Sequence, residues 1–521
     1  MTSLAHDRYI LDQSEGQEPT EHIVRKKTFI DVPDSNQGSY GSSQIQFNLS
    51  QLQHSSQYLD VKSSYLQVPI SLNITTDHNL GLVFDPSSNE SPVMIKSGIH
   101  NLINSVELYL GNQQVLSNQQ MSLVPISYRL MSAYTTDAMH IHGKSMYMYD
   151  TTYDDVKFDG DVGLTHYSSM ERNMSDVPDF TNDDDDFISK GAWTRLRNDY
   201  CERVSHQHYR VNIQATIPLV FLHESFFRSL PLLKGALLRM VISVNAPATC
   251  TWAAPFASDI LAYKPTVVTP TGVIPFMLNI GVDENGAPKE KVASSGAMTI
   301  SCQIGNREAT TCSVRCAMYE LTPAVERQLI SNPVKSLVFD DVLTYQNLTV
   351  EPGNSASQHQ ITSGLARATG MLILPFPSRR ANHDLSPFAS PYCNCPNVVL
   401  PYSCVSNFNV FVSGAPLLSQ NISYGYQQWL EHMKFFGGTD GNPVGALGEL
   451  HSGLLSQKDW QRNPFIYVNL QNRTDEEFPI VRSYAVSFDN LSKFECQYFV
   501  VIFYQKTCQI EVTTGQLVLN V

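Results

Sequence analysis

Two pairs of histidines are spaced so that both members of a pair could bind one metal ion. His140 and His142 are two residues apart, and so are His206 and His208. On a β-strand such residues share a face, and paired imidazoles are common zinc ligands. A metal site of this kind also needs a glutamate a few residues later, within a glycine frame, and Glu224 is too distant. We therefore expect surface or loop histidines and no catalytic metal.

The cysteines allow a similar comparison between a metal site and ordinary packing. Cys312 and Cys316 are in phase with Val314 and Met318, so all four fall on one face of an expected strand. Small buried thiols are common on such core faces. We therefore expect Cys312 and Cys316 to be core residues.

A second group of cysteines lies later in the chain. Cys393 and Cys395 are two residues apart, and Cys404 is nearby. Structural zinc sites usually contain paired Cys-x-x-Cys motifs, and that spacing does not occur in this sequence. The spacing therefore favours no metal, and the role of the Cys393/Cys395/Cys404 group stays open.

Residues 151–190 are strongly acidic, with 11 acidic against 3 basic residues, a local charge of about −8. Asp155, Asp159 and Asp161 faintly resemble a calcium loop. However, Lys157 occupies a ligand position, and His166 stands where a bidentate glutamate is required. A solvated loop that keeps the protein soluble is the favoured interpretation. Binding of a divalent ion elsewhere in 151–190 stays an open alternative.

The elements that would position such residues are mostly strands. Of 521 residues, 42% are hydrophobic and only 16% are charged, which suits a packed chain with few long surface helices. A chain of this length exceeds one ordinary core, so two domains are expected. The net charge of −14 excludes a protein that wraps nucleic acid with its whole surface. The basic run Arg25-Lys26-Lys27 is interpreted as solvated charge.

No membrane or secretory segment is expected. No stretch reaches the roughly 20 apolar residues that a membrane-spanning helix needs. Residues 1–12 also lack the apolar segment of a secretory signal. We therefore expect a protein that is not secreted and cysteines that stay reduced.

Hydrophobic alternation with a period of two dominates from residue 41 onward. It is clearest at 66–74, 209–221 and 484–488. Such alternation places one face of a strand on a core and the other toward polar surroundings. The continuous apolar run Tyr498 to Tyr504 predicts a strand that is buried on both faces or shielded by a neighbouring subunit.

Short helices are expected at 121–134, 223–234, 322–331 and 424–434. At 322–331, Thr322 can cap the helix and Pro323 suits its first position. A turn at Asn332-Pro333 follows, and about eight strand candidates lie on each side of it, which is the number in one jelly roll.

The sequence therefore predicts an all-β protein with two consecutive eight-stranded jelly-roll sandwiches, short helices and long loop insertions. The expected divisions are an N-terminal arm (1–40), jelly roll 1 (41–321) with insertions at 135–207 and 248–300, a linker helix and turn (322–335), and jelly roll 2 (336–521). If 1–40 is an arm, its deletion should leave the rest of the chain folded.

Four blocks resemble the double jelly-roll major capsid proteins of the tailless phage, adenovirus and giant-virus lineage. They are "SGIHNLINSVELYLGNQQV" (97–115) and the segments 215–245, 386–433 and 488–521. Within that lineage the sequence is most similar to Polinton/Maverick and adintovirus-like members. The acidic segment 151–190 and the "YCNC" motif are departures from the family pattern.

The resemblance implies a structural protein of the virion, assembled inside the host cell. Three copies would form a pseudo-hexagonal capsomer that tiles an icosahedral shell around a DNA genome. The implied partners are the chain itself, neighbouring capsomers, and penton and minor capsid proteins, without sequence-specific contacts to nucleic acid. The insertions would form outer towers or inter-subunit clasps, and the arm would tie capsomers together. No catalytic residue, cofactor or metal is implied.

Two other functions remain open at this point. A two-jelly-roll hydrolase acting on glycans would need two carboxylates about 5–10 Å apart in a pocket with aromatic walls. A lectin-like adhesion protein or viral spike would expose an aromatic shelf for sugars. A capsid protein would instead bury a large area between like subunits.

Overall fold

The computed structural model describes residues in both predicted halves of the chain. The described residues are 23–40, 44–54, 56–76, 93–95, 102–111, 113–117, 119, 158–159, 163–164, 201–205, 208–234, 238–244, 248–254, 264–268, 276–278, 296–307, 309–377, 404–429, 460, 464–470, 479–492 and 495–520. The helix expected at 121–134 lies outside these residues, as does most of the acidic segment 151–190.

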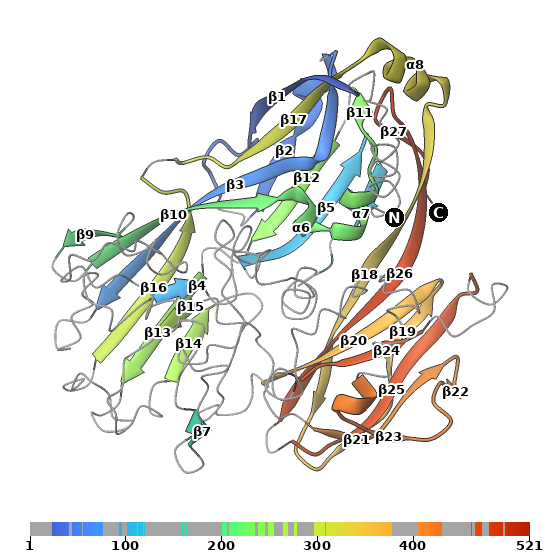
Figure 1. Cartoon of the computed structure of the whole chain (residues 1–521). Helices are drawn as coiled ribbons and strands as arrows, with labels where there is room; N and C mark the ends of the chain where they lie inside the picture. The colour runs from blue at the N-terminus through green and yellow to red at the C-terminus, as the bar shows by residue number, and fades with distance from the viewer. Residues whose placement is uncertain are drawn as a thin grey trace, which may run out of the picture.

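The first sandwich contains a nine-stranded sheet and a four-stranded sheet (Figure 1). The path of the larger sheet is β1 (Val24–Pro33), β17 (Ser313–Leu321), β3 (Tyr58–Thr76), β16 (Gly296–Ile304), β13 (Ala248–Ala254) and β14 (Lys264–Val268). Two further strands, β10 (His208–Pro218) and β11 (Leu233–Lys234), pair with β3, and β9 (Cys201–Ser205) pairs with β10. The smaller sheet is β2 (Gln44–Asn48), β12 (Leu238–Val244), β5 (Ile103–Leu110) and β6 (Gln113–Leu116).

The second sandwich contains two five-stranded sheets. One consists of β18 (Val334–Val350), β26 (Cys496–Glu511), β20 (Ala368–Pro377), β24 (Ile466–Asn469) and β27 (Gln516–Asn520). The other consists of β19 (Ser355–Leu365), β25 (Arg482–Asn490), β21 (Val405–Val412), β22 (Ala415–Pro416) and β23 (Ile422–Tyr424). Two small two-stranded sheets, β4 (Val93–Ile95) with β15 (Phe276–Leu278) and β7 (Phe158–Asp159) with β8 (Gly163–Leu164), complete the described sheets. The predicted fold of two consecutive jelly-roll sandwiches is confirmed.

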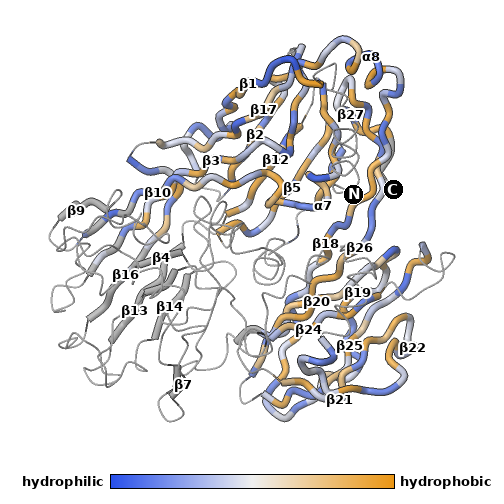
Figure 2. Tube along the Cα trace, viewed as in Figure 1, coloured by the Kyte–Doolittle hydropathy of each residue, from blue (hydrophilic) through white to orange (hydrophobic). Residues whose placement is uncertain are grey.

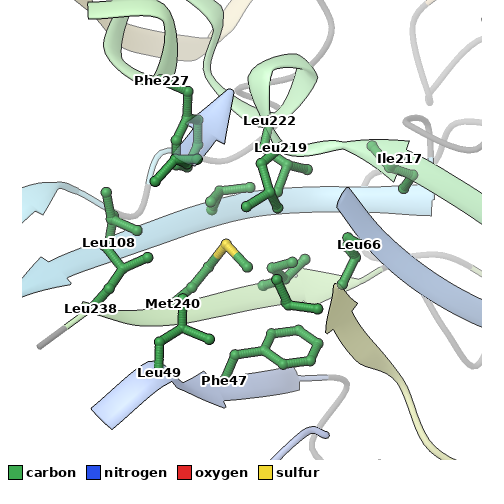
Figure 3. Packing of buried hydrophobic residues seen from close by; sticks show 14 of the residues in the cluster. Phe47, Leu49, Leu66, Leu108, Ile217, Leu219, Leu222, Phe227, Leu238 and Met240 are labelled. Atoms are coloured by element: carbon green, nitrogen blue, oxygen red, sulfur yellow. The ribbon is translucent and has the colours of Figure 1, made fainter. Parts of the chain in front are cut away.

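The alternating hydrophobic positions form the core of the first sandwich. Phe47 and Met240 come from the smaller sheet and Leu66 from the larger, and all three are fully buried. Figure 3 shows their side chains between the ribbons of the two sheets. Every second residue of a strand points into this space, so about half of the residues of each strand in the smaller sheet belong to the core.

The apolar run near the C-terminus forms the centre of the second sandwich. Strand β26 lies between β18 and β20, and its residues from Tyr498 to Phe503 are all buried. Neighbouring strands cover both edges of this run and packed side chains cover both of its faces. The run therefore has no alternating polar residues. The predicted strand buried on both faces is confirmed.

The expectation that 1–40 forms an arm outside the core is wrong for its second half. Strand β1 pairs with β17 along nearly its whole length, and Val32 is fully buried. Just after it, the carboxylate of Asp34 accepts hydrogen bonds from the Cys312 amide (2.6 Å) and the Tyr40 hydroxyl (2.5 Å). Strand β17 and Cys312 are distant in sequence from β1, so no local pattern indicated these contacts. Deleting 1–40 would remove part of the sheet, and only 1–22 lies outside the described residues.

The two expected insertions also contribute strands. In 248–300, β13 lies between β14 and β16, so this segment extends the larger sheet instead of forming irregular loops. In 135–207, β9 pairs with β10. The composition of 248–300, rich in Ala, Pro, Thr and Gly, hid these strands because their stabilisation comes from hydrogen bonds to neighbours on both sides.

The helices are short. The predicted helix at 322–331 is confirmed as α8 (Pro323–Ser331), although the Thr322 hydroxyl makes no capping hydrogen bond to the described residues. Residues 426–429 are helical, and the rest of the helix expected at 424–434 lies outside the described residues.

The helix expected at 223–234 was predicted too long. It is replaced by α6 (Leu219–Leu222), α7 (Glu224–Ser229) and strand β11. Helix α7 ends because Leu230 precedes a proline and is held in an extended conformation. A short 3₁₀ helix, η1 (Leu49–His54), follows β2.

Candidate functional site at the junction of the two sandwiches

Two strands run through both cores. The first half of β18 and the last residues of β26 pack into the first sandwich, where Leu337, Phe339 and Cys508 are buried. The remaining parts of the same strands pack into the second sandwich. Figure 2 shows hydrophobic residues along this part of the trace. The packing therefore crosses the division expected at residue 335, and continuous backbone joins the two cores.

A buried carboxylate lies where these strands pass from one core to the other. Asp341 of β18 is 2% exposed. Its Oδ2 accepts hydrogen bonds from Lys506 Nζ at 2.5 Å and from the Tyr504 hydroxyl at 3.2 Å. Its Oδ1 accepts the amide of Val342 at 2.8 Å and lies 3.3 Å from His223 Nε2. The carboxylate is thus surrounded by hydrogen-bond donors from both sandwiches.

These donors set the ionisation of the cluster. Burial by itself raises the pKa of Asp341, but the hydrogen bonds from His223 and Lys506, together with the ammonium charge of Lys506, outweigh burial and lower the pKa to about 2. Burial and the neighbouring Asp341 charge raise the pKa of Tyr504 above its ordinary value. At neutral pH the cluster therefore holds a buried carboxylate paired with a lysine ammonium.

His223 connects this cluster to the first sandwich. Its Nδ1 accepts the amide of Phe226 at 3.3 Å and so caps the N-terminus of α7. The rings of Phe226 and Phe339 meet edge to face with centroids 4.9 Å apart. One residue further along β18, the amide of Asp340 donates to Ser225 Oγ at 2.8 Å. Helix α7 is thereby fixed to β18 by polar and aromatic contacts.

A third element completes the junction. Lys506 Nζ donates to the carbonyl of Val115, on β6, at 3.5 Å. Gln119 Oε1 accepts the amide of Thr344, on β18, at 3.3 Å. With residues from β6, α7, β18 and β26 bound to one another, relative rotation of the sandwiches would break several buried contacts at once. The role that this arrangement supports is therefore mechanical. The site holds the two sandwiches in one fixed arrangement.

The junction residues were missed at the sequence level, although one signal pointed to them. Asp341 is in phase with Leu337 and Phe339, and Lys506 is in phase with Cys508 and Ile510, so each charge falls on a core face. A charged residue on a core face normally requires a partner, because an unpaired buried charge is costly. Two opposite charges in such positions are a recognisable pattern.

The histidine pairs do not form a metal site in the described part of the chain. His208 is within 3.4 Å of the side-chain oxygen of Asn73 on the neighbouring strand β3. His140, His142 and His206 lie outside the described residues. Within the described ranges, no group of three or more His, Cys, Asp or Glu side chains could hold a metal ion.

The core assignment of Cys312 and Cys316 is confirmed. Both side chains are buried in the core, with 0% of their surface exposed to solvent. Burial raises the pKa of each thiol to about 12. Cys404 is exposed, and Cys393 and Cys395 lie outside the described residues.

We expect thiol labelling of the native protein to follow this difference. Iodoacetamide at pH 8 should modify Cys404 and leave Cys302, Cys312 and Cys316 unmodified, because only an accessible thiolate reacts. Peptide mapping by mass spectrometry checks the result, with protein unfolded in guanidinium as the control in which all of them react. Rapid modification of Cys312 in the native protein would contradict its burial.

None of the helices in the described ranges has the length and apolarity needed to cross a membrane. The sequence matches no known family profile and no curated protein.

The solved structures that are similar over nearly the whole chain include two with TM-scores above 0.5. A chain in the cryo-EM structure of the Sputnik virophage aligns with a TM-score of 0.52 and 12% identity, over 95% of this chain and 89% of that one. The mavirus major capsid protein aligns with a TM-score of 0.51 and 8% identity, over 98% of this chain and 93% of that one. At these identities the likeness shows the fold, two jelly rolls in tandem, across nearly the full length of each chain.

Proposed function

We propose that this chain is the major capsid protein of a double-stranded DNA virus. Three copies form a pseudo-hexagonal capsomer, and the capsomers tile an icosahedral shell around the genome. Within the double jelly-roll lineage we place the chain with Polinton/Maverick or adintovirus-like members, on the sequence blocks described above. The protein acts as a structural component of the virion, without enzymatic activity, after assembly in the host cell.

The observation that carries this proposal is the rigid junction between two sandwiches of the same chain. A shell tile must keep its outline while it bears contacts on several sides. Here β18 and β26 pass through both cores, and the cluster around Asp341 fixes α7 and β6 to them. Interior packing of this kind resists gradual deformation. The likeness to the mavirus major capsid protein over 98% of this chain supports the same function.

Three copies suit this architecture because each contributes two sandwiches of similar kind. A closed ring of three chains then presents six sandwiches, and its outline approaches a hexagon. The contacts in such a ring are heterologous, so one side of a chain meets a different side of the next. We propose neighbouring capsomers and penton and minor capsid proteins as further partners.

The oligomeric state tests the proposal. Size-exclusion chromatography with light scattering on the full chain should give a trimer of three times 58.3 kDa, about 175 kDa, or larger shells. Negative-stain electron microscopy should then show particles with a hexagonal outline. A stable monomer at all protein and salt concentrations would contradict the capsid function and would favour a lectin-like or glycan-active protein.

A further inference from the structure

Strand β1 is the outermost strand of its sheet and pairs, within the described residues, with β17 alone (Figure 1). In an antiparallel pair every second residue directs its amide and carbonyl away from the partner. The outer edge of β1 therefore presents a row of backbone donors and acceptors that a further extended segment could pair with.

Both faces of β1 expose large hydrophobic side chains near this edge. Phe29 is 44% exposed on one face and Ile30 is 37% exposed on the other, and Ile23, just before the strand, is 60% exposed. Lysines alone would be an ordinary protection of a sheet edge against aggregation. Hydrophobic residues exposed on both faces give no such protection, and they are available for contact with another segment.

The surface around Phe29 is also cationic. Lys27 Nζ lies 5.3 Å from the Phe29 ring centroid and 5.2 Å from that of Tyr319, and the Arg315 guanidinium lies 5.4 Å from Phe29. Arg315 is 3.7 Å from Asp31. In the part of the chain that the structure describes, Lys26 and Lys27 have no carboxylate partner. A covering segment should therefore combine apolar residues with negative charge.

The first 22 residues have this composition and continue directly into β1. They contain five acidic residues and one basic residue, a charge of −4, together with the apolar run Tyr9-Ile10-Leu11. Gly16 and Pro19 are turn-forming residues that permit the chain to reverse before Ile23. Because the segment is tethered at the edge it would cover, its effective concentration there reaches the millimolar range.

We propose that residues 1–22 dock on the free edge and outer face of β1 in their own chain, through contacts to Lys27, Phe29 and Arg315. The acidic side chains pair with the cations, the apolar run covers Phe29, and the backbone adds to the sheet edge. Such strand addition is a common mode of peptide recognition. The docked segment shields β1 from edge-to-edge aggregation, and this inference does not depend on the capsid function.

Zero-length carbodiimide crosslinking of the full chain tests the proposal. An equal mixture of unlabelled and ¹⁵N-labelled protein should give amide crosslinks from Lys26 or Lys27 to Asp7, Asp12 or Glu15. Each crosslinked peptide should be wholly unlabelled or wholly labelled, because both partners belong to one chain. Mixed-label crosslinks would show docking on a different copy and would overturn the proposal. The proposal would also fail if Lys26 and Lys27 gave crosslinks to these acidic residues in a yield no higher than Lys335 does.

Variants that keep both lysines separate docking from simple proximity. Arg315→Glu should lower the crosslink yield by about threefold or more, since it replaces an attractive contact with a repulsive one. Arg239→Glu is the matched control, because Arg239 also lies over a ring, 4.2 Å from the Tyr109 centroid, in the other sheet. Equal yields in the two variants would contradict the proposal. Phe29→Ser is a second variant that keeps all charges, and it should also lower the yield.

Discussion

Replacing Asp341 with alanine should lower the free energy of unfolding by about 3–5 kcal/mol, the range for breaking a buried ion pair from one side. The change leaves Lys506, 21% exposed, without its carboxylate, and it removes the acceptor for Tyr504 and for the Val342 amide. Urea unfolding followed by tryptophan fluorescence measures the loss. Because Asp341 joins both sandwiches, the variant should also lose the single cooperative transition expected of one rigid unit.

Two controls test the cause of this loss. Asp489→Ala removes an exposed carboxylate that accepts hydrogen bonds from Ser355 and Asn407, and it should cost less than about 1 kcal/mol. The double variant Asp341→Leu with Lys506→Met should be more stable than Asp341→Ala, because no unpaired charge remains. If Asp341→Ala and Asp489→Ala were equally stable, the junction would not be the mechanical site proposed here.

Acid titration offers a separate measurement of the same cluster. The pKa of Asp341 falls from an ordinary 3.8 to about 2 in the folded protein. Its contribution is therefore complete above pH 3.8 and disappears as the pH falls through about 2. The shift corresponds to about 2 kcal/mol at neutral pH. The difference in stability between the wild type and Asp341→Asn should shrink over this range of pH.

Asn490 should produce the second large effect, a loss of about 3–5 kcal/mol on replacement by alanine. Asn490 is fully buried in the second sandwich. Its Nδ2 donates to the Val350 carbonyl at 2.9 Å, and its Oδ1 accepts the Ser492 amide at 3.0 Å and the Tyr498 hydroxyl at 3.1 Å. Alanine removes one partner from each of three buried polar groups, and a buried group that is left unsatisfied costs about 1–3 kcal/mol. Thermal and urea unfolding measure the loss.

Asn354→Ala is the matched control for Asn490. Its amide also makes a side-chain hydrogen bond, to Glu351 Oε2 at 3.0 Å, but in an exposed turn that water can reach. The expected cost is below about 0.5 kcal/mol, as for most surface substitutions. A loss at Asn354 as large as that at Asn490 would show that turn geometry, and not the buried amide, stabilises this corner of the sandwich.

The amino-acid sequence by itself determined the class of the fold and much of its core. Period-two alternation identified strands such as β3, and the unbroken apolar run identified the centre of β26. The phase of Cys312 and Cys316 with Val314 placed both thiols in the core, and Pro323 marked the start of α8. These features are local, because which face of a strand is buried depends on residues two positions apart.

Only the tertiary structure decided which segments pair and which charges meet. Strand β1 belongs to the larger sheet because β17, almost 300 residues later, supplies its hydrogen bonds. Strand β13 is stable because β14 and β16 lie on both sides of it. Asp341 and Lys506 are 165 residues apart, yet their side chains are 2.5 Å from each other. Such contacts depend on the path of the whole chain, and therefore no local periodicity contains them.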